Sequence, residues 1–122
     1  MNVTVRDYAR IGRLFLNSGV WEGEQIVPKQ WVIDSTTPDA PHLQPGKYPA
    51  SSNRSGYGYQ WWVPEHPEDD FVARGIYGQY IYVSRKYGVV IVKTSADPDW
   101  RASNPENYAM IAMMQRIAAG IK

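Results

Sequence analysis

Residues 71–94, FVARGIYGQYIYVSRKYGVVIVKT, most constrain what this chain can fold into, because they hold three runs rich in β-branched and aromatic residues. Glycine-containing segments separate these runs, which are Phe71–Arg74, Gln79–Ser84 and Val89–Lys93. In the middle run, tyrosines and a serine alternate with aliphatic residues, so the two kinds are expected on opposite faces of a sheet. The stretch therefore predicts three short strands joined by turns.

The segment between the first two runs, Gly75-Ile76-Tyr77-Gly78, has two glycines three positions apart where a strand begins. Glycines at such a place indicate a backbone that is exposed or bends sharply, because glycine reaches conformations closed to other residues. A strand that only packs has no need of them. We therefore look for function at this bend, with an ordinary turn as the plain alternative.

Two helices are predicted ahead of the sheet. Thr4 and Asp7 form a capping box at the start of the first, whose apolar residues recur at helical spacing until Gly19 closes it. Glu22-Gly23 is predicted as a turn between two short extended pieces, and Pro28 suits the first turn of a second, shorter helix.

The composition changes from residue 38 to residue 55, where prolines, glycine and serines predict a long, irregular surface loop of the kind that often walls a cleft. Gly56–Val63 (GYGYQWWV) is predicted to be one aromatic strand, in which Trp61 and Trp62 point to opposite faces. The next residues, Pro64–Asp70 (PEHPEDD), read as an acidic, solvated turn.

A final helix is predicted to start with a capping box of Ser103 and Glu106. Its apolar face is expected to lie over the sheet and comprises Met110, Met113, Met114, Ile117 and Ile121. The order of elements predicts an α+β fold in which helices flank a small antiparallel sheet of three to four strands, with residues 1–122 forming one unit.

The composition excludes some classes of partner and binding site but does not by itself indicate a function. The formal net charge is +1 with no run of Lys or Arg, which gives no sign of a nucleic-acid partner. The absence of cysteine excludes disulfides and thiolate metal sites. The sequence shows neither an apolar stretch approaching a membrane span nor a signal peptide, and the compartment stays open.

The chain holds no complete catalytic set of its own. No serine is followed three residues later by lysine, and Gly-x-Ser-x-Gly is absent. His66 and the acidic residues around it fit no metal-ligand spacing, so neither a metal nor a cofactor is predicted. Lys93-Thr94-Ser95 looks like the Lys-Thr-Gly triad of penicillin-recognising enzymes, but only a turn and a helix follow it.

Several segments, in order along nearly the whole chain apart from the proline-rich loop, resemble class C β-lactamase-related serine hydrolases. They are Thr4–Leu14 (TVRDYARIGRL), Gly19–Gly23 (GVWEG), Ile26–Val32 (IVPKQWV), Gly56–Trp62 (GYGYQWW) and Phe71–Gln79 (FVARGIYGQ). The branch that these segments resemble most is that of the aminohexanoate-dimer hydrolases and related esterases. No single motif is unique to the family, but their order and spacing together are fairly specific.

The resemblance implies a fold, a reaction and a site. The fold would be the C-terminal part of a β-lactamase/transpeptidase-like domain. In that family a Ser-x-x-Lys serine attacks an amide or ester carbonyl, with lysine and tyrosine moving protons. One of the two amides that hold the oxyanion maps onto Ile76. The substrate-binding residues would be Trp62, Gly75, Tyr77, Gly78 and Gln79, although packing in the core or on the sheet is the alternative for Trp62, Tyr77 and Gln79.

The resemblance also implies that the nucleophilic serine, the lysine and the tyrosine precede Met1, so that these residues alone would be inactive. The expected partners are the N-terminal part of the same hydrolase, a second copy of the chain through uncovered apolar faces, and a small amide or ester substrate. The rival hypothesis is a stand-alone binding module, whose Tyr and Trp residues would hold a sugar or a peptide by stacking.

Overall fold

The computed structural model describes residues 3–100 and 104–121, with side chains of the last helix described from residue 108 onward. The elements in chain order are α1 Val5–Leu16, β1 Val20–Trp21, β2 Glu24–Gln25, α2 Lys29–Ser35, the 3₁₀ turn η1 Pro41–Leu43, β3 Gly56–Tyr57, β4 Trp62–Val63, β5 Asp70–Gly75, β6 Gln79–Ser84, β7 Val89–Lys93 and α3 Asn104–Gly120. Within the described part of the chain, no helix has the length and apolar character needed to cross a membrane.

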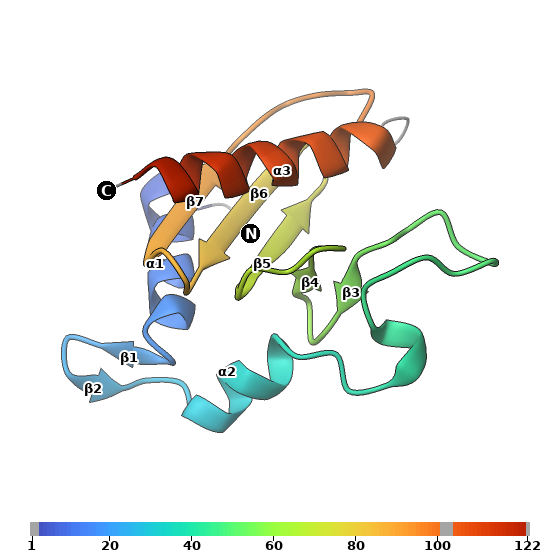
Figure 1. Ribbon diagram of the computed structural model, residues 1–122. Coiled ribbons are helices and arrows are strands. Elements are labelled where there is room, and N and C mark those ends of the chain that lie inside the picture. Colours follow the sequence, from blue (N-terminus) through green and yellow to red (C-terminus); the bar gives the residue numbers. More distant parts are fainter. Residues whose placement is uncertain (1–2, 101–103, 122) are drawn as a thin grey trace.

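The centre of the molecule is a five-stranded antiparallel sheet with the strand order β3-β4-β5-β6-β7 (Figure 1). The helix α3 lies across one face of this sheet, and α1 packs on the other face against β6 and β7 (Figure 1). The predicted α+β arrangement is therefore confirmed. The three predicted strands are present as β5, β6 and β7, each within one residue of its predicted bounds.

The sheet has more strands than the three to four predicted, because Gly56–Val63 is not one strand. It forms a hairpin in which Tyr57 of β3 pairs with Trp62 of β4. The turn between them is closed by a hydrogen bond of 2.8 Å from the Gly58 amide to the Trp61 carbonyl, and Gln60 has a φ of +68°. Adjacent aromatic residues made this stretch look like a continuous strand, but the left-handed residue reverses the chain.

The alternation predicted for β6 is confirmed, since its residues divide between two apolar clusters. Tyr80 and Tyr82 pack on the α3 side, whereas Ile81 and Val83 pack on the α1 side. The two adjacent tryptophans divide in the same way. Trp61 is buried against Phe15 of α1 with ring centroids 4.7 Å apart, and Trp62 packs against the cluster on the α3 side. Both faces of the sheet are therefore covered.

The capping box of Thr4 and Asp7 is present at the start of α1, as predicted. The predicted capping box of Ser103 and Glu106 falls on residues whose side chains lie outside the described part. The predicted apolar face of α3 is wrong in part. The residues that pack on the sheet are Met110, Ile111, Met114 and Ala118, whereas Met113, Ile117 and Ile121 are 42–54% exposed. One helix face is too narrow for all the apolar residues, so a second apolar stripe faces outward.

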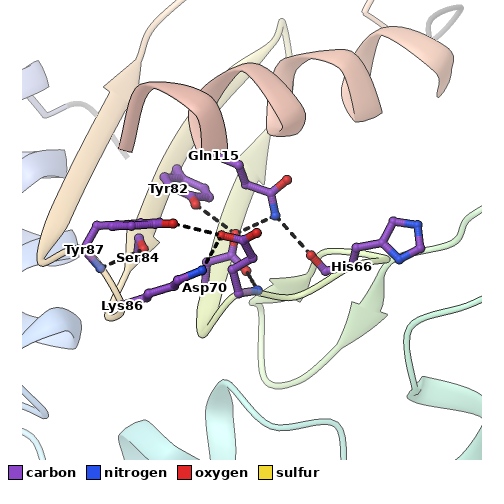
Figure 2. A network of polar contacts seen from close by, with 8 residues as sticks. His66, Asp70, Tyr82, Ser84, Lys86, Tyr87 and Gln115 are labelled. Carbon is purple, nitrogen blue, oxygen red and sulfur yellow. Dashed lines mark hydrogen bonds and ion pairs between the residues drawn. The ribbon is translucent and has the colours of Figure 1, made fainter. Parts of the chain in front are cut away.

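Asp70 corrects the reading of Pro64–Asp70 as a solvated turn, because its side chain is only 4% exposed. Figure 2 shows Asp70 among the side chains with which it forms hydrogen bonds. Its carboxylate accepts hydrogen bonds from the Glu68 amide at 2.7 Å, the Tyr82 hydroxyl at 2.8 Å and the Gln115 side-chain amide at 2.9 Å. Burial and the Asp70 carboxylate raise the pKa of Tyr82 well above its ordinary value. These contacts join the start of β5 to β6 and α3.

Candidate functional site

The bend predicted to carry function is the turn of the β5–β6 hairpin. The last pair of the ladder is Gly75 with Gln79, so three residues make the turn. Tyr77 and Gly78 both lie in the left-handed region, with φ values of +62° and +75°. The side chains of Ile76 and Tyr77 are 54% and 46% exposed. The bend is therefore open to solvent and is not covered by neighbouring side chains.

The bend is held in place by residues that follow β6. The Lys93 Nζ donates to the Gly78 carbonyl at 3.0 Å, and the Asp97 amide donates to the Tyr77 carbonyl at 3.2 Å. The ring of Tyr77 lies edge-on to Trp100, with centroids 6.3 Å apart. Among the described residues, the Ile76 amide has no hydrogen-bond acceptor. The carbonyls of Tyr77 and Gly78 are thus engaged, while the amide of Ile76 remains available to a ligand.

A hollow of about 200 Å³ adjoins the bend. Its walls come from α1, β5, β6 and β7 and are formed by Tyr8, Ala73, Arg74, Gly75, Gln79, Tyr80, Ile81 and Lys93. Of the predicted site residues, Gly75 and Gln79 line this hollow. Ile76, Tyr77 and Gly78 continue the same turn beyond its wall. Trp62 lies on β4, the strand next to β5, where it pairs with Val72. The structure therefore brings five of the six residues together in one turn and its flanks.

Trp62 is connected to the bend through Arg74, which the sequence reading did not single out. The guanidinium carbon of Arg74 lies 3.7 Å from the centroid of the Trp62 ring. Tyr57 packs against the same tryptophan, with centroids 4.5 Å apart. Burial lowers the pKa of Arg74 from its ordinary value. Because the ordinary pKa of arginine lies far above 7, the guanidinium still carries its charge at neutral pH. The signal in the sequence was a lone cation at the end of the otherwise apolar run Phe71–Arg74.

Lys93 also belongs to this site, although Lys93-Thr94-Ser95 is not predicted to be a Lys-Thr-Gly triad. It ends β7, the edge strand of the sheet, and its ammonium lies 5.8 Å from the centroid of the Tyr80 ring. Among the described residues, Arg74 and Lys93 are the only charged side chains lining the hollow. In the part of the chain that the structure describes, no group of three or more side chains is placed to hold a metal ion. The site is thus suited to polar or anionic groups.

Comparison with known proteins supports the resemblance found in the sequence. No protein-family model matches the chain. A 6-aminohexanoate-dimer hydrolase from Paenarthrobacter ureafaciens is 29% identical over 100 residues, which are 81% of this chain and 26% of that protein. A solved structure from Bacillus anthracis, provisionally named a 6-aminohexanoate-dimer hydrolase, is 31% identical with a TM-score of 0.66. The match covers 94% of this chain and 30% of that one.

The chain therefore spans between a quarter and a third of the length of these two relatives. The predicted resemblance to the aminohexanoate-dimer hydrolases is confirmed, and so is the α+β fold of a β-lactamase-like hydrolase part. The comparisons say nothing about which residues act. The roles of Ile76, Trp62, Gly75, Tyr77, Gly78 and Gln79 stay predictions.

Proposed function

We propose that this chain forms part of a serine hydrolase that cleaves an amide or ester bond. In this proposal the Ile76 amide donates a hydrogen bond to the oxyanion of the tetrahedral intermediate. The nucleophilic serine and its lysine and tyrosine belong to polypeptide that is not part of these residues. The observation that carries the proposal is the exposed turn, whose first amide lacks an acceptor in the described part, in a chain similar to hydrolases.

The turn is chemically suited to this role. Left-handed residues at Tyr77 and Gly78 fold the chain tightly enough to turn a main-chain amide outward, and glycine on either side leaves room for a carbonyl group. A backbone amide held by a sheet needs little reorganisation when charge develops on the substrate. Tyr77 is the middle residue of the turn and Gln79 follows it, and Trp62 would form a more distant wall of the substrate site.

The proposal is tested by hydrolysis of p-nitrophenyl butyrate, followed by absorbance. Two proteins are compared: the chain alone, and a hybrid in which the chain replaces the similar part of the Bacillus anthracis protein. We expect turnover by the hybrid and none above background by the chain. A folded hybrid that is inactive on this ester and on a matching anilide would contradict the proposal. Turnover by the chain alone would contradict the proposal that the nucleophilic serine lies outside these residues.

The partners proposed for the chain follow from its exposed apolar residues. Met113, Ile117 and Ile121 form an outward stripe on α3, and Val5 and Ile26 are half exposed near α1. We propose that the rest of the hydrolase, or a second copy of the chain, covers such surface. Size-exclusion chromatography at low concentration tests this, and a stable monomer that shows no affinity for the remaining hydrolase part would contradict it.

A second candidate function, the binding of a sugar or a peptide, is favoured by one observation. Trp31 of α2 and Tyr59 of the β3–β4 turn are 52% and 45% exposed, and their ring centroids lie 5.5 Å apart. Exposed aromatic pairs of this kind provide stacking surfaces for sugars. Binding of cello- or chito-oligosaccharides by the wild-type chain, lost in Trp31→Ala, would support this candidate. Tryptophan fluorescence that does not change when these oligosaccharides are added to the wild-type chain would contradict this candidate function.

A further inference from the structure

The exposed aromatic pair of Trp31 and Tyr59 is carried by two segments whose backbones are joined. The Tyr59 amide donates a hydrogen bond of 2.9 Å to the carbonyl of Ser35, the last residue of α2. A Cβ atom at Gly58 would collide with the same carbonyl oxygen, so glycine is needed for the β3–β4 turn to approach α2 this closely. The backbones that carry the two rings are therefore fixed relative to each other, and the ring planes are inclined by 47°.

Two carboxylates lie beside these rings. Asp34 follows Trp31 by three residues on α2, which places both side chains on one face of the helix. The Tyr59 hydroxyl donates to an Asp39 carboxylate oxygen at 3.4 Å. The Asp39 charge, followed by desolvation and the Asp34 charge, raises the pKa of Tyr59 above its ordinary value. Both acidic groups therefore act on the space around the ring of Tyr59.

Neither of these carboxylates forms an ion pair with another described residue. Asp34 accepts a hydrogen bond of 2.8 Å from the side-chain amide of Gln30, which is neutral. Asp39 is exposed and takes only the contact from Tyr59. The negative charge beside the two rings is therefore left for a ligand to balance.

Exposed ring faces next to unpaired carboxylates favour a cation over a neutral ligand. The face of an aromatic ring is the negative part of its quadrupole, and it attracts cations such as quaternary ammonium groups. Nearby carboxylates add Coulombic attraction for the same ligand, whereas a neutral sugar gains nothing from their charge. A quaternary ammonium group has no N–H to donate, so ring faces and charge are the interactions that can hold it.

We propose that Trp31 and Tyr59, flanked by Asp34 and Asp39, bind a quaternary ammonium group. The site comprises α2, the segment that follows it and the β3–β4 turn, and it shares no residue with the bend at Gly75–Gly78. The inference therefore does not depend on the hydrolase proposal. It uses the aromatic pair of the second candidate function but names a cationic ligand in place of a neutral one.

Binding is tested on the 122-residue chain without any turnover. The probes are choline and neohexyl alcohol, the neutral analogue in which carbon replaces the choline nitrogen. Each is titrated at constant ionic strength and followed by ¹H–¹⁵N spectra that include the indole N–H of Trp31. We expect saturable binding of choline, with a dissociation constant at least about fivefold lower than that of neohexyl alcohol. Added sodium chloride should weaken choline binding, because it screens the two carboxylates.

A quaternary ammonium group can belong to a soluble molecule or to a lipid headgroup, and sedimentation with phosphatidylcholine vesicles separates these sources. Given the preference for choline, co-sedimentation with the vesicles assigns the site to a lipid headgroup. Choline binding without co-sedimentation assigns it to a soluble ligand. Phosphatidylglycerol vesicles, which lack the ammonium group, are the control.

Four variants assign the effect to the rings and the charge. Asp39→Asn keeps the shape of the side chain and is expected to weaken choline binding about threefold or more, with neohexyl alcohol binding unchanged. Trp31→Leu is expected to abolish the preference for choline, whereas Tyr59→Phe keeps a ring face and should retain it. Glu24→Gln is the matched control, because it removes the charge of an exposed carboxylate on β2 and should leave choline binding unchanged.

The proposal is overturned if the wild-type chain binds choline no better than neohexyl alcohol, including the case in which it binds neither. It is also overturned if Glu24→Gln weakens choline binding as much as Asp39→Asn. Oligosaccharide binding by a chain that shows no preference for choline would leave the second candidate function in its place. In the hybrid, failure of the hydrolase proposal alone would appear as absent ester turnover with choline binding intact.

Discussion

The two ends of the β5–β6 hairpin differ in whether their polar groups are buried and paired or exposed and unpaired. At one end, the Asp70 carboxylate is buried and accepts three hydrogen bonds within the chain. At the other end, the Ile76 amide is exposed without an acceptor among the described residues, and Arg74 has no carboxylate partner there. These two ends belong to one ladder of six residue pairs, which begins at Asp70 and Ser84 and ends at Gly75 and Gln79.

The difference indicates which end holds the structure together and which is free for a ligand. Buried polar groups are stable only when they are paired, so the Asp70 end fixes β5, β6 and α3 to one another. That fixed base allows the far turn to hold left-handed residues and an unpaired amide. We therefore call the Asp70 end the closed end and the Gly75–Gly78 end the open end.

Removing the Ile76 amide at the open end is expected to have the largest effect of the changes that test this comparison. Ile76→Pro deletes the N–H, and in the hybrid we expect turnover of p-nitrophenyl butyrate to fall about 10²–10³-fold. Lys86→Pro is the matched control in the β6–β7 turn, where proline suits the second position and turnover is expected to stay within about twofold. Equal losses in both variants would remove the special role of the open end.

Asp70→Ala tests the closed end. It leaves the Tyr82 hydroxyl and the Gln115 amide without their acceptor, so the free energy of unfolding is expected to fall by about 2–4 kcal/mol. Urea unfolding followed by circular dichroism measures this. The control is Asp39→Ala, because Asp39 is exposed and takes only a 3.4 Å contact from Tyr59, and its effect should stay below about 0.5 kcal/mol. Similar losses would argue against a closed end.

The pH dependence of stability gives a second view of the closed end. The pKa of Tyr82 is raised in the folded chain, so its neutral form is favoured there, and the stabilisation is complete below the unfolded value of about 10. Above that pH the free energy of unfolding is expected to fall, by up to about 1.4 kcal/mol per pH unit for this residue. Tyr82→Phe should reduce this slope, whereas Tyr77→Phe at the open end should not. An unchanged slope in Tyr82→Phe would contradict the account.

The smallest effect is expected from two glycines that occupy similar turns. Gly78 and Gly88 have φ values of +75° and +66°, and added methyl groups would meet no atom closer than 3.6 Å at Gly78 and none within 4 Å at Gly88. Replacing either with alanine should lower stability by about 1 kcal/mol through backbone strain alone. Only Gly78→Ala should also lower the turnover of p-nitrophenyl butyrate by the hybrid. If both variants lower turnover equally, the two turns do not differ as proposed.

The strands β5, β6 and β7 were predictable from the sequence because their signals are local. The runs at Phe71–Arg74, Gln79–Ser84 and Val89–Lys93 alternate or carry β-branched residues throughout, and Thr4 with Asp7 caps α1 within one turn. The bend was also found locally, from two glycines. Each of these patterns spans fewer than seven residues, so it can be recognised from the sequence without knowing the fold.

What the sequence did not reveal depends on contacts between distant segments. Asp70 looks like part of a charged turn, and only packing by α3 shows that it is buried beside Gln115. Arg74 appears as one cation in a strand, and its importance follows from Trp62, which pairs with β5 through a separate hairpin. The outward stripe of α3 was missed because the sequence supplies more apolar residues than one helix face can bury.

The most direct test of the open end is a crystal structure of the hybrid after reaction with a p-nitrophenyl alkylphosphonate, whose bound oxygen mimics the oxyanion. The account predicts a phosphonate oxygen about 2.7–3.1 Å from the Ile76 nitrogen, with the turn in its present conformation. A phosphonate bound elsewhere, or an oxygen that makes no hydrogen bond to this turn, would contradict it.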